Sequence, residues 1–237
     1  AKCIKCGRCV QVCQHLQGVY ALEFTSRGDA TTMSPAFHLP LNESPCIQCG
    51  QCVVHCPVGA IYEYDECDKL LDAIEDPDTV VMAQMAPAVR VAIGEEFGFK
   101  PGEVTTGKLY SALRRLGVDY VFDTNFGADL TIMEEGYELL NRIQKGGVLP
   151  QITSCCPGWV NYCEEYYPEL LENLSSAKSP MMMQGAIEKT YTAEKLGVEP
   201  KKIFSLAIMP CTAKKGEINR DGDHASSSGY KDVDLVL

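Results

Sequence analysis

The sequence predicts two folded parts: a small α+β domain followed by an α/β domain with a mainly parallel sheet. Two observations predict this division. Eight of the thirteen cysteines lie between Cys3 and Cys56 in two copies of one spacing, and from residue 79 onward apolar strand patterns alternate with helical ones. We therefore expect a first domain over 1–64, a connector over 65–78 and a second domain over 79–237.

The composition excludes several classes of protein. The chain has 237 residues, of which 46% are hydrophobic and 22% charged, as in a globular protein. Its formal net charge of -11 argues against nucleic-acid or anionic-membrane partners, which need clustered Lys and Arg. Its apolar stretches fall short of the roughly 18 residues of a membrane span. We expect a cytoplasmic protein whose partners are other proteins or small neutral molecules.

The repeated cysteine spacing is C-x2-C-x2-C-x3-C, the pattern of two-cluster bacterial ferredoxins. Three cysteines in a tight loop cap one face of a 4Fe-4S cube, and the fourth reaches a second cluster. Zinc sites have no use for a third and fourth cysteine at these offsets, and disulfides within such short loops are strained. We therefore expect a ferredoxin-like α+β domain with two 4Fe-4S clusters. The expected ligands are Cys3, Cys6, Cys9 and Cys56 for one cluster, and Cys46, Cys49, Cys52 and Cys13 for the other.

This module departs from the simplest ferredoxin pattern in two places. Gln14 stands where the motif usually has proline, which affects the loop exit but no ligand. The long spacer over 14–45 must contain an added hairpin or loop. Three histidines have no metal-ligand spacing and are expected to be structural: His15, His38 and His55.

The second part alternates strands with helices. A charged helical connector over 65–76 precedes an apolar strand over 79–86, which Pro87 ends. Further strands are expected over 120–122, 149–153, 203–209 and 232–237, and helices over 89–97, 108–116, 130–143, 160–167 and 180–196. This alternation indicates a parallel sheet, and ligands of such folds bind at the carboxyl ends of the strands. The residues expected at those ends are Pro87, Cys155, Cys156 and Cys211.

Two segments of the second part resemble the iron-only (FeFe) hydrogenases. Residues 153–159, Thr-Ser-Cys-Cys-Pro-Gly-Trp, and 209–217, Met-Pro-Cys-Thr-Ala-Lys-Lys-Gly-Glu, are similar to the first two signature segments of that family, and 85–87 and 126–135 resemble it too. The resemblance implies an oxidoreductase that interconverts dihydrogen with protons and electrons. Its cofactor would be a further 4Fe-4S cube linked to a two-iron unit, the H-cluster. Its electron partners would be ferredoxin, another redox protein or partner subunits.

The resemblance also implies roles for single residues. Cys156 and Cys211 would be cube ligands, and Cys155 would pass protons to and from the two-iron unit. A thiol suits that role because its pKa, about 8.5, lies nearer neutrality than that of a hydroxyl. Lys214 would form a charge-assisted hydrogen bond to a cyanide ligand. The residues that would line the pocket are Ala86, Pro87 and Met209, and those that match an outward proton relay are Glu135, Glu138, Arg142 and Ser175.

The family's third signature segment, which supplies two more cysteines, is absent from the sequence. Because a cube needs four ligands, the chain as written cannot hold a complete active site. We expect a segment of a longer hydrogenase, with a shortened or naturally reduced chain as alternatives. Two other functions stay open: a non-catalytic relative that resembles the iron-sulfur assembly proteins, and a plain electron-transfer subunit.

Several features have an equally simple structural interpretation. Glu138 and Arg142, four residues apart, could form an exposed salt bridge on a helix. The methionines at 181–183 are as compatible with core filling as with a cofactor pocket. Cys67 and Cys163 belong to no motif and are expected to be packed thiols.

Overall fold

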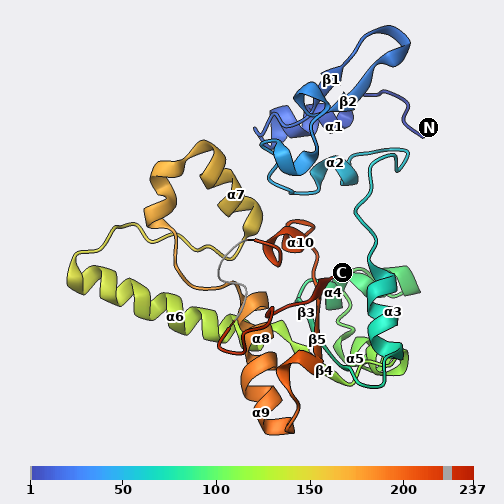
Figure 1. Cartoon of the computed structure of the whole chain (residues 1–237). Coiled ribbons are helices and arrows are strands. Elements are labelled where there is room, and N and C mark those ends of the chain that lie inside the picture. Colours follow the sequence, from blue (N-terminus) through green and yellow to red (C-terminus); the bar gives the residue numbers. More distant parts are fainter. Residues whose placement is uncertain (1, 221–225) are drawn as a thin grey trace. The chain divides into compact units, whose positions relative to one another are not determined.

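The chain folds into two units, shown in Figure 1 as a computed structural model that describes residues 2–220 and 226–237. The first unit combines Ala1–Tyr64 with two later segments, Cys156–Leu171 and Cys211–Ala213. The second contains the remaining residues, Asp65–Cys155, Glu172–Pro210 and Lys214–Leu237. The segments that carry Cys156 and Cys211 therefore belong to the unit of the repeated cysteine motif.

In the first unit, each cysteine loop turns into a short helix through a glycine. Helix α1 (Arg8–Gln11) follows Gly7, and α2 (Gln51–Val54) follows Gly50. The two glycines have φ angles of 75° and 72°, a conformation that costs little only without a Cβ. Helix α1 continues into a π-helical turn, η1 (Val12–Leu16). Gln14 lies within that turn, and proline there would interrupt it.

The spacer between the motifs contains the expected hairpin. Strands β1 (Glu23–Thr25) and β2 (Thr32–Ser34) pair antiparallel, and Glu23 faces Ser34. Three short 3-10 turns complete the spacer: η2 (Gly28–Ala30), η3 (Ala36–His38) and η4 (Leu41–Glu43).

Helix α7 (Pro157–Tyr166) belongs to the first unit and begins three residues earlier than expected. Proline is well suited to the first turn of a helix, because the N–H that it lacks has no partner there. The Tyr166 hydroxyl donates a short hydrogen bond to the Val19 carbonyl. This contact ties α7 to the segment just beyond Cys13.

The second unit is built on a parallel sheet, as expected. Among the described residues its strands are β3 (Val80–Met85), β4 (Tyr120–Asp123), β5 (Ile203–Ile208) and β6 (Leu235–Val236), in the order β4-β3-β5-β6. Met85 pairs with both Asp123 and Ile208, so three strands end at the same level. The residues that follow these strands therefore share one edge of the sheet.

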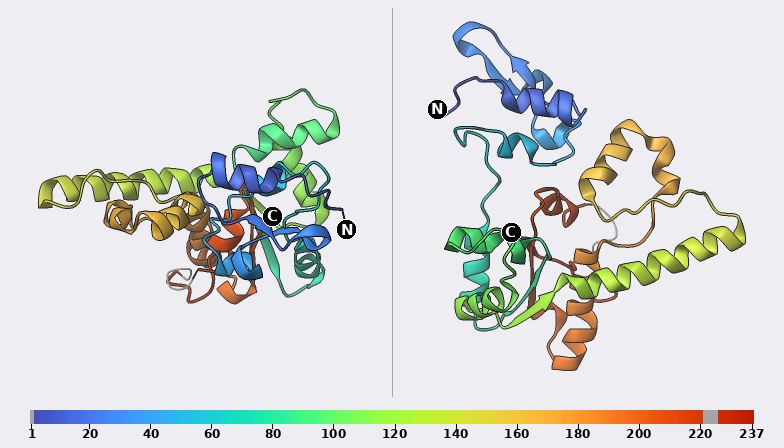
Figure 2. Two further views of the ribbon diagram at one scale, coloured as in Figure 1. Left: turned by 90° about the horizontal axis from the view of Figure 1, so that it is seen from above. Right: turned by 180° about the vertical axis from the view of Figure 1, so that it is seen from behind.

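Helices cover both faces of this sheet (Figures 1 and 2). Val81, Ala83 and Met85 pack on one face against α3 (Cys67–Glu75) and α5 (Thr106–Leu116). Alternate residues such as Met82 face the other side, where α8 (Pro180–Ile187), π-helical η7 (Glu188–Thr192) and α9 (Ala193–Leu196) lie. The shorter helical elements are α4 (Val89–Ala92), η5 (Ile93–Phe97), η6 (Pro168–Asn173), η8 (Pro200–Lys202) and α10 (Ala213–Glu217).

Helix α6 (Thr124–Lys145) is longer than the predicted span of 130–143. Its N-cap is Asp123, whose carboxylate accepts the Asn125 N–H at 2.9 Å, and it ends before Gly146. It packs against α8 at Gly127, where an added Cβ would lie 2.1 Å from the Pro180 carbonyl oxygen. The rest of α6 runs out beyond the sheet (Figure 1).

The prediction of a strand over 149–153 is wrong. In the structure, Ile152 forms only an isolated parallel bridge with Leu174. Pro150 lacks the N–H that a ladder requires, and the Ile152 backbone instead bonds to Asn173 and Ser175. Cys155 and Cys156 consequently do not follow a strand of the sheet, contrary to the prediction.

Two other elements are shorter than predicted. Of 89–97 only the first turn is α-helical, and the rest is a 3-10 helix. Of 232–237 only Leu235 and Val236 form a strand, because the Asp232 carboxylate accepts from Lys178 and from the Ser226 N–H. Within the described residues, no helix combines the length and the apolar character needed to cross a membrane.

Candidate cluster sites and proton-transfer residues

One set of four thiols surrounds a cavity in the first unit. The cavity has a volume of about 170 Å³ and is lined by Cys3, Cys6, Cys9 and Cys56, among others. The Ala60 N–H lies 3.2 Å from Cys56 Sγ, and the Lys5 N–H lies 3.4 Å from Cys3 Sγ. Backbone N–H groups of residues 58–61 lower the pKa of the Cys56 thiol. Such donors stabilise thiolates that ligate iron, so this set fits a 4Fe-4S cluster.

A second set of thiols lines a smaller cavity of about 30 Å³. Its members are Cys13, Cys46, Cys49 and Cys52. Burial, and then the neighbouring Cys46 and Cys49, raise the pKa of Cys52 to about 11. A cationic iron centre favours the thiolate and relieves this crowding of like charges, so this set fits a cluster too. The structure thus brings the fourth cysteine of each motif to the other motif's loop.

The cysteines of both sets are available as ligands, because none is paired with another cysteine. All thirteen cysteines are described, and none forms a disulfide. Among the described residues, no three His, Cys, Asp or Glu side chains converge tightly enough to hold a single metal ion. A cube differs from such a site, because each of its four thiolates binds a different iron.

The remaining predicted iron ligands, Cys156 and Cys211, both lie in the first unit. Cys156 is exposed and occupies the N-cap position of α7, while Cys211 is partly buried beyond the end of β5. Two thiolates make half of the donor set of a cube.

Cys155 and Lys214 lie together in the second unit. The Lys214 ammonium donates a 2.8 Å hydrogen bond to the Cys155 carbonyl and forms a 2.6 Å ion pair with Glu217. The side chains of Lys214 and Glu217 are each only 12% exposed. A largely buried cation held at the Cys155 backbone can donate to an anionic ligand.

The predicted lining residues lie at the carboxyl edge of the sheet. The Ala86 N–H donates to the Ile208 carbonyl at 3.0 Å, and the Met209 N–H donates to the Leu237 carbonyl at 2.8 Å. Ala86–Pro87 and Met209 therefore leave neighbouring strands side by side. This edge is where ligands of parallel sheets bind.

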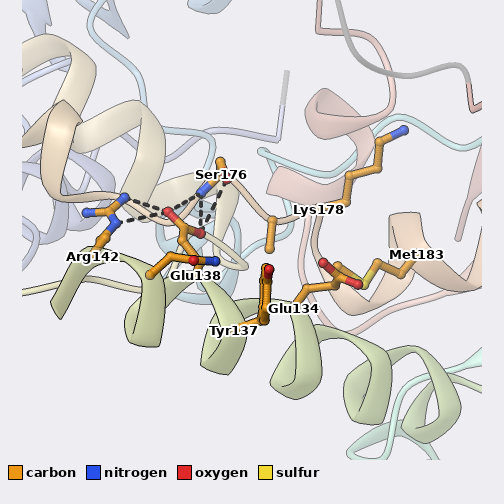
Figure 3. A pocket seen from close by; sticks show the side chains of 9 residues that line it. Glu134, Tyr137, Glu138, Arg142, Ser176, Lys178 and Met183 are labelled. Carbon is orange, nitrogen blue, oxygen red and sulfur yellow. Dashed lines mark hydrogen bonds and ion pairs between the residues drawn. The ribbon is translucent and has the colours of Figure 1, made fainter. Parts of the chain in front are cut away.

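The Glu138 carboxylate joins α6 to the segment at 175–176. It accepts the Ser175 hydroxyl at 2.8 Å. It also pairs with Arg142 at 2.6 Å (Figure 3). Burial opposes the charge on Glu138, but hydrogen bonds from Ser175 and Arg142 outweigh it and hold the pKa of Glu138 below its ordinary value. Ser176 also donates to the carboxylate, through its N–H at 3.0 Å. The side chains of Glu138 and Arg142 are only 18% and 15% exposed, so their salt bridge is largely buried rather than exposed.

A cavity of about 560 Å³ opens beside this carboxylate. Figure 3 shows Glu138, Arg142 and Ser176 at one end, with Met183 and Lys178 at the other. A carboxylate beside a cavity with room for several waters can exchange protons with solvent. The complete lining is Glu134, Tyr137, Glu138, Asn141, Arg142, Ser176, Ala177, Lys178 and Met183.

Glu135 lies on the same helix without bonding to Glu138. One of its carboxylate oxygens is buried and has no hydrogen-bond partner among the described residues, and the same holds for the Gln151 Oε1. The Gln151 amide donates to the Glu135 backbone carbonyl at 3.0 Å. Such unsatisfied acceptors are sites where a proton or a water can be bound.

Other residues behave largely as expected. Cys163 is fully buried, and Met181 and Met182 belong to the core, which confirms packing roles for them. The prediction of a packed Cys67 is wrong, because Cys67 begins α3 and is exposed. The histidines at 15, 38 and 55 are exposed, and the last two bond to Ser34 and to the Gln51 carbonyl.

Sequence reasoning missed two partners in these groups. Glu217 lies three residues after Lys214, a helical ion-pair spacing that could have signalled it. Ser176 follows Ser175 directly, but nothing in the sequence indicates that both serines turn toward Glu138.

Comparison with known families agrees with this geometry. Residues 79–237 match the model of the iron-only hydrogenase large subunit, C-terminal domain. The chain belongs to the iron-only hydrogenase family. Residues 2–60 match the model of the 4Fe-4S dicluster domain, so the N-terminal module is of the kind that carries two 4Fe-4S clusters.

Similar proteins include two hydrogenases aligned along the whole chain. The NADP-reducing hydrogenase subunit HndD of Solidesulfovibrio fructosivorans is 47% identical over 242 residues, and iron hydrogenase 1 of Clostridium pasteurianum is 45% identical over 236. Each alignment covers 100% of this chain and 41% of the relative. The chain thus spans less than half the length of these two relatives.

A solved structure of a variant of the FeFe-hydrogenase HydA1 from Chlamydomonas reinhardtii gives a TM-score of 0.68 at 46% identity, covering 72% of this chain and 44% of that one. The periplasmic [Fe] hydrogenase large subunit of Nitratidesulfovibrio vulgaris is 45% identical, covering 83% of this chain and 54% of its own length. More distant is the cytosolic iron-sulfur assembly component 3 of Bos taurus, 30% identical over 81% of this chain and 42% of its own.

Proposed function

We propose that this chain supplies part of an FeFe hydrogenase that interconverts dihydrogen with two protons and two electrons. The observation that carries the proposal is the meeting of the Cys155 backbone with the Lys214 ammonium, because both residues match the family's active-site motifs. The similarity of the whole of this chain to part of two named hydrogenases supports it, since the iron-sulfur assembly relative is less similar. When bound, the H-cluster would supply the centre at which dihydrogen is split or formed.

The chain's own residues would hold this group and move its protons. Cys156 and Cys211 would supply two thiolates to the cube, so two more must come from residues that this sequence does not contain. Lys214 would donate to an anionic ligand, and Ala86, Pro87 and Met209 would shape the pocket.

Protons would pass outward from Cys155 through Glu135, Ser175 and Glu138, and Arg142 would hold the Glu138 carboxylate at the outer end of this relay. The Ser175 hydroxyl already donates to Glu138, and Arg142 keeps that carboxylate ionised and ready to accept a proton. The cavity beside Glu138 would give the relay its exit to water.

Electrons would enter or leave through the N-terminal clusters. We propose Cys3, Cys6, Cys9 and Cys56 as ligands of one, and Cys13, Cys46, Cys49 and Cys52 as ligands of the other. The partner would be ferredoxin, another redox protein or a partner subunit. We also propose a cytoplasmic location, because thirteen unpaired thiols suit a reducing compartment.

The test uses the full-length gene product, loaded with iron and assayed anaerobically. We expect infrared bands from bound CO and cyanide, and dihydrogen turnover with a viologen dye. Cys155→Ser should keep the bands while turnover falls by about 100-fold or more, since it removes a proton-transfer group. Cys67→Ser is the matched control, because Cys67 is exposed and outside every set.

Two outcomes would contradict the proposal. Full turnover by Cys155→Ser would refute its proton-transfer role. A fully loaded protein without infrared bands or turnover would favour the iron-sulfur assembly class instead.

A further inference from the structure

The loop of the second cysteine motif touches the segment that carries Cys211. The Thr212 hydroxyl donates a 2.8 Å hydrogen bond to the Gln48 carbonyl. A Cβ on Gly50 would lie 2.6 Å from Thr212 Oγ1 and 3.3 Å from its methyl carbon, so these two segments of the chain are in close contact. All of these residues lie in the first unit.

The same loop also touches the segment that carries Cys156. A Cβ on Gly158 would stand 3.5 Å from the Ile47 carbonyl oxygen and 3.9 Å from Cys156 Sγ. The Asn161 amide lies 3.5 Å from the same carbonyl oxygen. The carbonyls of successive loop residues thus contact the segments that carry the two proposed cube ligands.

The first cysteine motif provides an internal comparison. Lys5 and Gln48 occupy the same place in the two loops, with φ angles of 55° and 59°. The equivalent glycines also match in conformation, yet a Cβ on Gly7 would meet the ring of Phe24 at 2.6 Å. The glycine of the first loop is therefore covered by Phe24 of the spacer hairpin, and the glycine of the second loop by Thr212, next to Cys211.

We propose that Thr212 is a positioning residue, whose hydrogen bond holds the turn of Cys211 against the 46–52 loop and thereby sets the rate of electron exchange between their two sites. The inference rests on the proposed function, which places iron-sulfur clusters at both. Each exchange moves one electron, so that one site is oxidised and the other reduced by one, without a proton transfer or a change of covalent bonds.

Threonine suits this position for two reasons. Its bond fixes the separation between the two sites, on which electron transfer depends steeply. The threonine methyl fills the space over Gly50, and hydrogen bonding and solvent access near a cluster set its potential.

Three variants of the full-length, cluster-loaded protein separate these effects. Thr212→Val keeps the shape and removes the donor, while Thr212→Ser keeps the donor. Thr31→Val is the matched control, because Thr31 donates an equally long 2.8 Å bond to the Gly28 carbonyl, within the spacer. Iron and sulfide content, with the visible absorbance, establish that every variant is loaded.

The first readout is amide hydrogen exchange. In Thr212→Val the amides of residues 46–52 should exchange about fivefold faster, while those of 3–9 stay unchanged. The second is electron paramagnetic resonance of the reduced protein, in which the magnetic interaction between the second cluster and the cube should weaken. Thr212→Ser and Thr31→Val should retain the wild-type spectrum.

A loaded Thr212→Val protein with wild-type exchange and spectrum would overturn the inference, as would loss of the interaction in Thr212→Ser. If the valine variant does not load, Thr212→Ala removes the donor with less bulk and takes the same measurements. If the wild-type protein loads its cube but does not turn over dihydrogen, the hydrogenase proposal is refuted. The inference about Thr212 is not refuted by that result, because its magnetic readout does not require catalysis.

Discussion

The Ser175 hydroxyl donates a 2.8 Å hydrogen bond to the Glu138 carboxylate, and this bond joins α6 to the segment that follows the Ile152–Leu174 bridge. The bond is one of the interactions that lower the pKa of Glu138. Two separate stretches of sequence therefore create a single proton-binding group.

Ser175→Ala should raise the pKa of Glu138 and slow dihydrogen turnover by about 10-fold or more. The pH dependence of turnover should shift upward, because the carboxylate loses a donor to its charged form. Ser176→Ala is the control, since it removes only a longer hydroxyl bond of 3.3 Å, while the Ser176 N–H still donates to Glu138 at 3.0 Å. Equal turnover and pH profiles in the two variants would contradict a special role for Ser175.

Arg142→Met should destabilise the second unit by about 2–4 kcal/mol. The guanidinium bonds to Glu138 and to the carbonyls of Val148, Glu172 and Leu174, so its loss leaves several acceptors unpaired. Lys145→Met, at an exposed position of the same helix, should change stability by no more than about 0.5 kcal/mol. Denaturant unfolding followed by circular dichroism measures both variants, and similar unfolding midpoints for the two would contradict the prediction.

Two glycines of α6 should respond in opposite directions to alanine. Gly127→Ala should cost about 3 kcal/mol or more, because the new Cβ would lie 2.1 Å from the Pro180 carbonyl oxygen. Gly136→Ala should stabilise by up to about 1 kcal/mol, because that site opens to space and alanine favours a helix. Thermal unfolding of both variants checks this, and a neutral Gly127→Ala would show that α6 and α8 can separate.

Glu188→Gln should remove part of the pH dependence of stability. Burial raises the pKa of Glu188 to about 7, although hydrogen bonds from Ser205 and Gln184 work against it. The folded state therefore holds a proton that the unfolded chain, with a pKa of about 4.3, has released. The stability contributed by this group falls as pH rises from about 4.3 to about 7, and then stays level.

The variant should match the wild type near pH 5 and be more stable near pH 8 by about 1–3 kcal/mol, because a neutral amide carries no burial cost for charge. Unfolding midpoints across this range measure the difference. Glu194→Gln, at an exposed position of the neighbouring helix, should leave the slope unchanged. A Glu188→Gln variant with the wild-type slope would show that Glu188 is charged in the folded state.

Much of the arrangement follows from local sequence. The cysteine spacing predicts two sulfur donor sets, because three thiols in a tight loop suit one cubane face. The alternation of strands and helices predicts the parallel sheet, since a strand that continues in the same direction needs a crossover helix. These rules act over a few residues, so they can be read without the fold.

Only the tertiary structure decided which distant residues meet. Nothing local distinguishes Ile152, which forms an isolated bridge, from a strand residue, because its partners lie more than twenty residues away. The same holds for Thr212, whose bond partner is 164 positions earlier. The sequence by itself determined the chemistry of each group, and long-range packing determined its neighbours, because hydrogen bonds and close contacts depend on positions in space rather than on spacing along the chain.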